Sequence, residues 1–207
     1  MNSTPSESRT PPPLFIVVSG PSGVGKDALL QRMVERGNPL HVVVTYTTRG
    51  RLQGERDGVD YRFLEDEAFR SHIAAGGMLE YALVYDKGYY GVPIAPVRQG
   101  LNSGMDTIVR VDVQGARTIR VKVPNAIQVL LKPPSLKVLE ERLRRRGRDS
   151  EESIQRRLKR AESEMSDLSL FDYVIVNEDN ALAAAAEALE AIIVAEHHRS
   201  APRTVSV

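Results

Sequence analysis

The stretch "GPSGVGK" has the residue types and spacing of a phosphate-binding loop. Gly20 is followed five residues later by Gly25, and Lys26 comes directly after it. Glycines allow a tight turn whose backbone N–H groups point at a phosphate, and the lysine supplies a cation for its outer oxygens. The pattern therefore predicts a nucleotide site. Its expected phosphate-binding residues are Gly20, Pro21, Ser22, Gly23, Val24, Gly25, Lys26 and Asp27.

Asp27 departs from the usual form of such a loop, in which a serine or threonine follows the lysine and its hydroxyl ligates Mg²⁺. A carboxylate also binds Mg²⁺, directly or through a water molecule. Asp27 falls in the first turn of a predicted helix as well, where the helix dipole stabilises an anion by about 0.3 to 1 kcal/mol. Both roles, metal ligand and helix-end anion, stay open on the sequence alone.

A second carboxylate, Asp112, follows the mainly apolar stretch 107–111. Open parallel sheets bind their ligands at the carboxyl ends of strands, and proteins with a phosphate-binding loop often keep a carboxylate near the metal there. We therefore expect Asp112, like Asp27, to hold Mg²⁺ directly or through water. The alternative is a loop cap without a ligand.

These residues must be positioned by strands and helices that alternate along the chain. The apolar run 14–20 predicts a buried strand, and apolar residues at helical spacing predict a helix from Lys26 up to Gly37. The other predicted strands are 41–48, 107–114, 126–132 and 173–177, and the other predicted helices are 114–122, 136–146 and 181–197. The alternation is typical of an α/β protein, here the three-layer P-loop NTPase fold with a central parallel sheet flanked by helices.

Two segments interrupt this alternation. Residues 43–97 are polar and rich in glycine, which predicts an inserted subdomain of short strands and helices. Residues 135–168 are densely charged, which predicts a solvated helical lid. The core of a single domain, 14–197, is then made by 14–42, 98–134 and 169–197, with a disordered tail at 1–13 and a flexible tail at 198–207.

Length and composition indicate one soluble domain. The 207 residues are 42% hydrophobic and 27% charged, and the formal net charge of +1 gives no general attraction to nucleic acid or membranes. The absence of cysteine excludes disulfides and thiolate metal sites. Neither a targeting signal nor a run of about 18 apolar residues occurs. We therefore expect a cytoplasmic protein with no nucleic acid and no membrane as partner.

Several motifs in one order resemble the guanylate kinase family over about residues 14–195. They are "GPSGVGK", "TTR" with "GE..G..Y", "YYG", "VDVQGA", "PPS", "RGRDSEESIQRRL" and "VIVN". The resemblance implies a nucleoside monophosphate kinase of purine nucleotide metabolism, which uses ATP and Mg²⁺ to phosphorylate GMP to GDP by direct in-line transfer. It also implies use of dGMP, a monomer or homodimer, and ATP and GMP as the small-molecule partners.

By the same resemblance, the insert 43–97 binds GMP. Arginine and tyrosine side chains suit its phosphate, a glutamate can accept from guanine N1–H and N2–H, and a threonine hydroxyl can lie near O6. The implied GMP-binding residues are Thr45, Arg49, Tyr61, Glu80, Tyr90 and Asp112. The implied catalytic residues are Lys26, Arg142, Arg146 and Arg157, and Asn177 is implied on the adenine side of ATP.

Three further positions depart from the family pattern. Leu52 stands where a second phosphate-binding arginine is usual, and Val92 follows "YYG" where Ser or Thr would offer a hydroxyl. Arg110 stands two residues before the strand-end aspartate, where many relatives are acidic. Because Arg110 adds a positive charge and Asp27 adds a negative one, we expect the two to form a single compensated change.

Two other functions stay as alternatives. "GPSGVGKD" also resembles the loop of ribose bisphosphate phosphokinases, although Thr45 and Glu80 would have little purpose there without guanine. A non-catalytic guanylate-kinase-like interaction module is the second alternative. Such modules usually have eroded phosphate loops, whereas Gly20, Gly25 and Lys26 are all present here.

Overall fold

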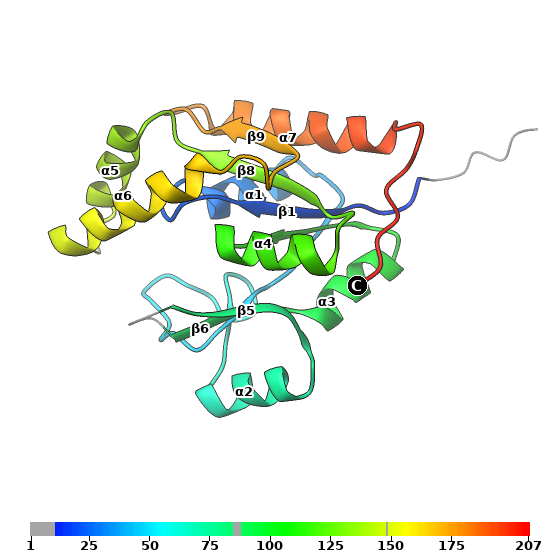
Figure 1. Cartoon of the computed structure of the whole chain (residues 1–207), viewed down its shortest axis with the longest axis horizontal. Coiled ribbons are helices and arrows are strands. Elements are labelled where there is room, and N and C mark those ends of the chain that lie inside the picture. The colour runs from blue at the N-terminus through cyan, green and yellow to red at the C-terminus, as the bar shows by residue number, and fades with distance from the viewer. Residues whose placement is uncertain (1–10, 85–87, 148) are drawn as a thin grey trace, which may run out of the picture.

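A parallel five-stranded sheet lies at the centre of the computed structural model, which describes residues 11–84, 88–147 and 149–207 (Figure 1). Its strands, in spatial order, are β2 (Leu40–Val42), β7 (Asp106–Arg110), β1 (Phe15–Ser19), β8 (Ile127–Lys132) and β9 (Tyr173–Val176). The predicted α/β fold with a central parallel sheet is confirmed. Residues 1–10 of the expected disordered tail lie outside the described residues.

Helices cover both faces of this sheet. The central strand β1 has apolar side chains on both faces, and each face must be buried. The helices are α1 (Lys26–Glu35) and α7 (Leu182–His197) on one face, and α3 (Ile94–Asn102) and α4 (Val113–Lys122) on the other (Figure 1). Ile16 and Val18 pack with the first pair, whereas Phe15 and Val17 pack with the second. Burial on both faces accounts for the continuous apolar run in the sequence.

The strand register brings predicted site residues to one edge of the sheet. Val18 of β1 lies beside Arg110 of β7, in parallel. The phosphate-binding loop starts at Gly20, directly after β1, and Asp112 follows β7 by two residues. Both therefore lie at the carboxyl edge, where open α/β sheets bind their ligands.

The insert 43–97 contains a second sheet, of spatial order β4-β3-β6-β5. Its elements are β3 (Tyr46–Thr47), β4 (Arg62–Phe63), β5 (Met78–Val84), β6 (Gly88–Pro93) and the helix α2 (Asp66–Ala74). Figure 1 shows it beside the core, joined to it on the side of α3 and α4. Leu79 and Val92 of this sheet pack into the same apolar cluster as α3 and α4.

The single strand predicted for 41–48 is wrong. The chain forms β2 in the core sheet, leaves it, and then forms β3 in the insert sheet. The run "HVVVTYTT" is rich in β-branched residues throughout and contains no turn residue. Its pattern therefore does not indicate where the chain leaves one sheet for the other.

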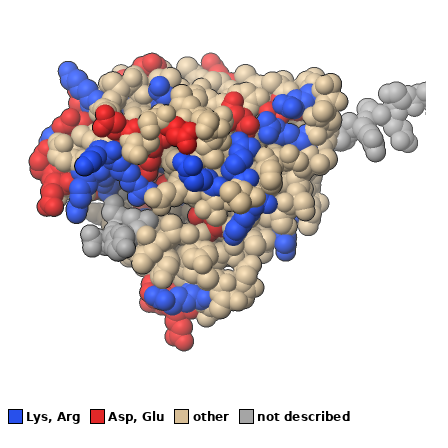
Figure 2. Space-filling model, in the orientation of Figure 1, with Lys and Arg blue, Asp and Glu red and all other residues tan. Residues whose placement is uncertain are grey.

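The segment predicted as a lid, 135–168, contains α5 (Leu136–Arg145) and α6 (Glu151–Ser166). Each helix starts at a serine, Ser135 or Ser150, whose hydroxyl accepts a backbone N–H of the first turn. The two helices share a small core of Leu139, Leu143, Ile154 and Ala161. Acidic and basic side chains are interspersed over this end of the molecule in Figure 2, so its visible face has no single sign of charge.

Residues 198–207, expected to be a flexible tail, lie against the core. Figure 1 shows them running from the end of α7 across the sheet edge to α3. Val205 and Val207 pack on the cluster formed by α3 and α4, and Arg98 Nε donates to the carbonyl of Val207 at 2.7 Å. Among the described residues, no helix has both the length and the hydropathy needed to cross a membrane.

Candidate active site

The phosphate-binding loop 20–25 depends on glycine conformations that other residues adopt only with strain. Gly20 and Gly25 have φ angles of 145° and 105°. A Cβ at Gly20 would overlap the carbonyl oxygen of Leu131, and a Cβ at Gly25 would lie 2.7 Å from Nδ2 of Asn177. Gly25 is also the N-cap of α1, so the N–H groups of the first helical turn are available to a phosphate.

Lys26 lies half-buried at the start of α1, with its ammonium turned back over the loop. Its Nζ donates to the carbonyl oxygens of Gly20 at 2.5 Å and Pro21 at 3.2 Å. Burial lowers the pKa of Lys26, while the charges of Asp27 and Asp112 act in the opposite direction. The lysine is thus held over the loop, where the motif requires it.

Asp27 forms an ion pair with Nε of Arg110. The Asp27 side chain is 68% exposed, whereas that of Arg110 is only 9% exposed. The two departures from the family pattern are therefore in direct contact, and the compensated change expected of them stays a prediction. The pair joins the first turn of α1 to the carboxyl end of β7.

Asp112 makes two contacts with its two carboxylate oxygens. One accepts from the backbone N–H of Gly115 at 2.8 Å, which makes Asp112 the N-cap of α4. The other accepts from Nη2 of Arg160 in α6 at 2.7 Å. Asp112 is thus a helix cap, and a lid arginine reaches the same carboxylate. The sequence reading assigned nothing to Arg160, although its spacing from Arg157 puts the two on neighbouring positions of one helix face.

Arg49 is enclosed by groups of the insert. Its guanidinium donates to both carboxylate oxygens of Glu55, each at 2.8 Å, and its Nε donates to the Tyr90 hydroxyl at 3.0 Å. Its Cζ lies 5.2 Å from the ring centroid of Tyr61. The structure thus brings together the three residues expected at the GMP phosphate, and it adds Glu55, to which no role was assigned.

Tyr61 also contacts Arg110, whose Cζ lies 4.9 Å from the centre of the ring. A second contact from Arg110 goes to the backbone oxygen of Asp60, which accepts from Nη2. Burial raises the pKa of Tyr61, so its hydroxyl stays protonated and able to donate at neutral pH. Arg110 therefore touches the insert as well as α1.

Glu80 and Thr45, the expected guanine-binding pair, are both buried. Burial raises the pKa of Glu80 to about 8, and the negative charge of Asp112 adds to the effect while Lys122 opposes it. Backbone packing is tight here, because a Cβ at Gly115 would come within 3.1 Å of a Glu80 carboxylate oxygen. An unusually basic carboxyl thus sits at the wall that the insert shares with α4.

The other two departures from the family pattern differ in their surroundings. Val92 is fully buried and lies opposite Glu80 in the β5–β6 ladder, so it fills core volume. Leu52 is 43% exposed in the loop that follows β3. A second arginine is thus missing from this loop, and nothing in the structure explains why leucine occupies the position.

Arg157 reaches the phosphate-binding loop from the lid. Its Nη1 donates to the Ser22 hydroxyl at 2.7 Å, and its Nη2 pairs with Asp149 at 2.8 Å. The structure therefore places this expected catalytic arginine at the loop itself, with Asp149 fixing its orientation.

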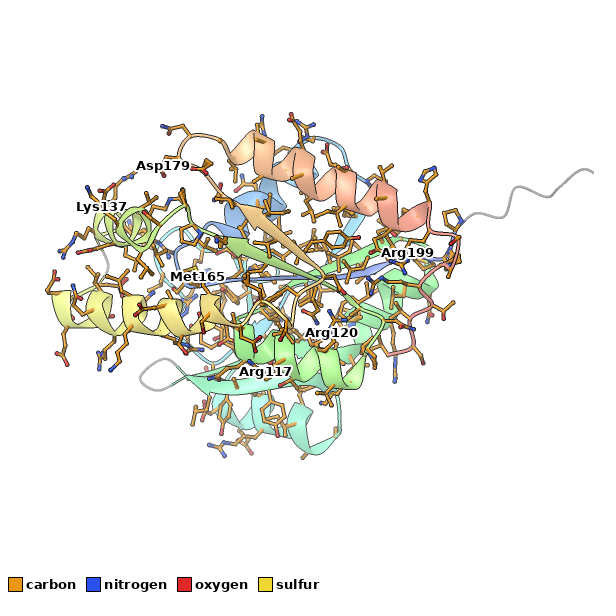
Figure 3. All side chains as sticks on the ribbon, turned by 45° about the horizontal axis from the view of Figure 1, so that its top comes forward. Arg117, Arg120, Lys137, Met165, Asp179 and Arg199 are labelled. Carbon is orange, nitrogen blue, oxygen red and sulfur yellow. The ribbon has the colours of Figure 1, made fainter. Side chains whose placement is uncertain are left out.

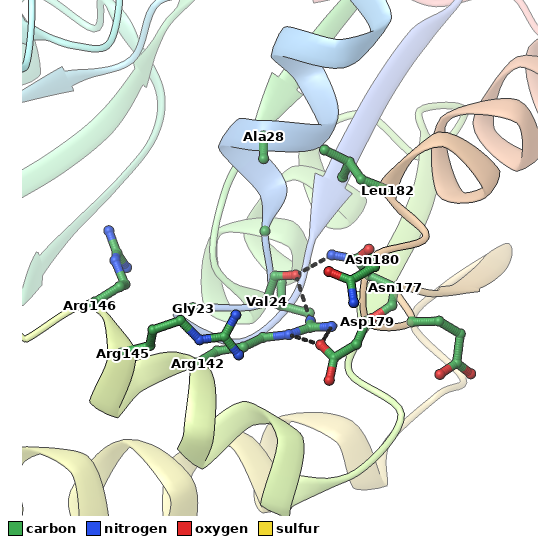
Figure 4. Close-up of a pocket in the computed structure, with 12 residues that line it drawn as sticks. Gly23, Val24, Ala28, Arg142, Arg145, Arg146, Asn177, Asp179, Asn180 and Leu182 are labelled. Atoms are coloured by element: carbon green, nitrogen blue, oxygen red, sulfur yellow. Dashed lines mark hydrogen bonds and ion pairs between the residues drawn. The ribbon is translucent and has the colours of Figure 1, made fainter.

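Arg142 and Asn177 meet beside the loop in a pocket of about 270 Å³ (Figure 4). Arg142 Nη2 donates to the backbone oxygen of Asn177 and to the carboxylate of Asp179, both at 2.7 Å. Asn177 Nδ2 donates to the carbonyl of Val24 at 2.8 Å. Figure 3 shows Asp179 in the loop that leads into α7, on the side where α5 carries Lys137.

Arg146 lies at the end of α5 and lines the same pocket. Figure 4 shows it farther from Asp179 than Arg142 is. Within the described residues its guanidinium has no hydrogen-bond or ion-pair partner, so it is available to an anionic ligand.

A family model described as guanylate kinase matches residues 13–196. The chain belongs to the guanylate kinase family. This confirms the family predicted from the motifs, and with it the enzyme class, a nucleoside monophosphate kinase.

Individual guanylate kinases are similar over most of their length. The guanylate kinase of Gloeobacter violaceus is 46% identical over 182 residues, which span 88% of this chain and 87% of that one. The guanylate kinase of Streptococcus thermophilus is 46% identical over 187 residues, or 90% and 88% of the two chains. The crystal structure of guanylate kinase from Anaplasma phagocytophilum superposes with a TM-score of 0.76 at 29% identity, covering 92% of this chain and 89% of that one.

The fit of a metal to this guanylate kinase site depends on Asp27 and Asp112. Among the described residues, no group of three or more His, Cys, Asp or Glu forms a metal cage of its own. Mg²⁺ in nucleotide sites is held mainly by phosphates and water, with one or two protein carboxylates. One exposed carboxylate at the loop therefore fits a metal that arrives with the nucleotide.

Proposed function

We propose that this chain transfers the γ-phosphoryl group of ATP directly to a phosphate oxygen of GMP, which yields ADP and GDP. One observation carries the proposal: Arg110 contacts Asp27 beside the phosphate-binding loop and Tyr61 in the insert. The donor loop and the acceptor residues therefore meet at one point, as direct transfer requires. Family membership supports the same reaction.

On the acceptor side, Arg49, Tyr61 and Tyr90 hold the GMP phosphate. Arg49 exchanges the carboxylate of Glu55 for the phosphate, to which its planar guanidinium can donate two parallel hydrogen bonds. Glu80 accepts from guanine N1–H and N2–H, and Thr45 contributes near O6. Adenine presents a different pattern of donors and acceptors, so it is rejected.

On the donor side, the backbone N–H groups of residues 20–25 and the ammonium of Lys26 hold the ATP phosphates. Arg157, Arg146 and Arg142 add positive charge from the lid, and Asn177 lies on the adenine side. The attacking phosphate oxygen is already anionic, so catalysis consists of positioning and charge neutralisation without a strong base. Asp27 and Asp112 would hold Mg²⁺ directly or through water, and the ion would supply charge neutralisation at the phosphates.

The two alternatives have less support. A ribose 1,5-bisphosphate phosphokinase has no use for the buried pair Glu80 and Thr45. A non-catalytic module needs no cation over an intact loop, whereas Lys26 and Arg157 both lie there. We further propose a cytoplasmic enzyme, a monomer or homodimer without nucleic-acid or membrane partners, that also uses dGMP.

The proposal is tested by a coupled assay of ADP release with GMP, dGMP, AMP, ribose 1,5-bisphosphate or no acceptor. GMP and dGMP should support turnover, and the other conditions should stay at background. Lys26→Ala should lower GMP-dependent turnover by about 100-fold or more, the loss typical of a transition-state charge contact. Lys137→Ala, an exposed lysine of α5, is the matched control. Normal turnover in Lys26→Ala would contradict the mechanism.

A further inference from the structure

Arg110 is a largely enclosed cation that contacts both α1 and the insert. Its side chain is only 9% exposed at the carboxyl end of β7, next to the strand that leads into the phosphate-binding loop. A buried guanidinium is costly unless it is paired, and this one has Asp27 as its carboxylate partner. The exposed carboxylate of Asp27, in the first turn of α1, therefore neutralises the charge of Arg110.

The opposite side of Arg110 faces the expected acceptor phosphate. Its guanidinium lies over the ring of Tyr61 and donates to the backbone oxygen of Asp60. Tyr61 in turn contacts Arg49 and the ring of Tyr90, the other two residues expected at that phosphate. Arg110 thus lies within the cluster of residues expected at the acceptor phosphate, although its carboxylate partner, Asp27, lies on the side of the donor site.

The acceptor phosphate has one arginine fewer in this chain than the family pattern provides. Leu52 occupies the place of a second arginine and is exposed, and Arg49 is already held by both oxygens of Glu55. A phosphate dianion beside Tyr61 therefore needs more positive charge than the loop supplies, and Arg110 is adjacent to that ring.

We propose that Arg110 is a phosphate-binding residue. Its guanidinium pairs with Asp27 while the donor site is empty, and it pairs with the acceptor phosphate when the donor site is filled. The inference rests on the proposed function. With the donor nucleotide and Mg²⁺ present, Asp27 is engaged by the metal or its water shell and no longer holds Arg110. The guanidinium then forms an ion pair with the GMP phosphate. Binding of the donor nucleotide therefore increases the affinity for GMP.

The test is GMP affinity, measured by calorimetry with a non-hydrolysable ATP analogue present and either Mg²⁺ or EDTA. In the unmodified chain, the GMP Kd should be at least about fivefold lower with Mg²⁺, the lower end of typical coupling between sites. Guanosine, which has no phosphate, should show no such difference. An equal gain for guanosine would overturn the proposal.

Variants separate the switch from other effects of Mg²⁺. Arg110→Gln should bind GMP weakly in both conditions, and Asp27→Asn should bind it tightly in both, because Arg110 then has no competing partner. Arg62→Gln, an exposed arginine of the same insert paired with Asp57, should behave like the unmodified chain. A Mg²⁺-dependent gain that survives in Arg110→Gln overturns the proposal. If Arg110→Gln fails to fold, a Mg²⁺-dependent gain that survives in Asp27→Asn overturns it equally.

GMP-dependent ADP release by the unmodified chain is recorded in parallel. Turnover without the affinity switch refutes the role of Arg110 alone, whereas absence of turnover refutes the proposed function itself.

Discussion

Glu80 is a buried carboxyl that is expected to work in its charged form. Burial and the nearby charge of Asp112 raise its pKa to about 8, so at neutral pH the unliganded chain keeps it mostly protonated. A protonated carboxyl cannot accept from both N1–H and N2–H of guanine. On the proposed role of Glu80, we therefore expect binding of GMP to release a proton.

GMP affinity should consequently rise with pH. With a pKa of about 8, the ionised fraction of Glu80 rises from about a tenth at pH 7 to about a half at pH 8, so the GMP Kd should fall by about fivefold over that range and level off only well above pH 8. This window lies above the second pKa of the GMP phosphate, which is about 6. Calorimetric titrations from pH 7.0 to 8.5 measure the change. Glu80→Gln should remove the dependence, and an unchanged Kd over this range would refute it for the native chain.

The residue types at the site were readable from the sequence, but their partners were not. Lys26 and the glycines belong to a local motif, and the family resemblance supplied candidate roles for Glu80 and Arg49. Glu55, Arg160 and Asp179 escaped notice because their importance comes from contacts across folded elements. An ion pair between distant residues leaves no periodic signal in the sequence.

The loop and the first turn of α1 form one structural unit. Gly25 has φ 105°, and the side-chain nitrogen of Asn177 lies against its Cα while donating to Val24. Asn177, directly after β9, thus braces the loop. An alanine at this position must displace that brace as well as adopt a left-handed backbone.

Gly25→Ala should lower the free energy of unfolding by about 2 to 4 kcal/mol and weaken ATP-analogue binding, because strain and displacement of Asn177 add. Gly37→Ala is a matched control, since Gly37 has φ 79° and open space around its Cα. It should cost only about 1 to 2 kcal/mol of strain and leave nucleotide affinity unchanged. Urea denaturation and analogue titration measure both. Identical losses in the two variants would show that the brace is unimportant.

At the level of elements, strands that are buried on both faces were predicted well because their apolar runs are bounded by glycine or polar residues. The stretch 41–48 failed because two strands of different sheets follow one another without a turn signal. The helical lid was predicted from the dense charge of residues 135–168, and its first helix from the apolar spacing within 136–146. Which lid arginine meets Ser22 and which meets Asp112 depended on how α6 lies over the core, which no local pattern encodes.

Across the whole molecule, the segment 198–207 fastens the end of α7 to the rest of the core. Glu196 is almost fully buried and accepts from Tyr173 at 2.7 Å and from Arg203 Nε at 2.9 Å. Arg203 also pairs with Asp172 at 3.5 Å. Burial alone would raise the pKa of Glu196, but the hydrogen bonds from Arg203 and Tyr173 lower it overall.

Arg203→Ala should lower the free energy of unfolding by about 2 to 3 kcal/mol at pH 7, because it leaves a buried carboxylate with weaker partners. A lowered folded-state pKa gives stability that is present above the ordinary pKa of 4.5 and lost at lower pH. The difference between variant and native chain should therefore shrink at pH 4. Arg36→Ala, which breaks a pair with Glu190 at the surface, should destabilise the chain much less than Arg203→Ala, because solvent screens an exposed ion pair. Urea denaturation at both pH values provides the comparison, and a pH-independent difference would contradict the role of Glu196.

The bond between Arg49 and Glu55 also affects how the enzyme behaves among the many anions of a cell. Glu55 is tethered six residues away, so it competes for the guanidinium at a high effective concentration. Sulfate or inorganic phosphate has only its charge with which to displace this carboxylate. GMP adds the binding energy of its base, so it can complete an exchange that small anions cannot. On the proposed role of Arg49, Glu55 is therefore an internal competitor of the acceptor phosphate, and we expect GMP to displace it where a small anion does not.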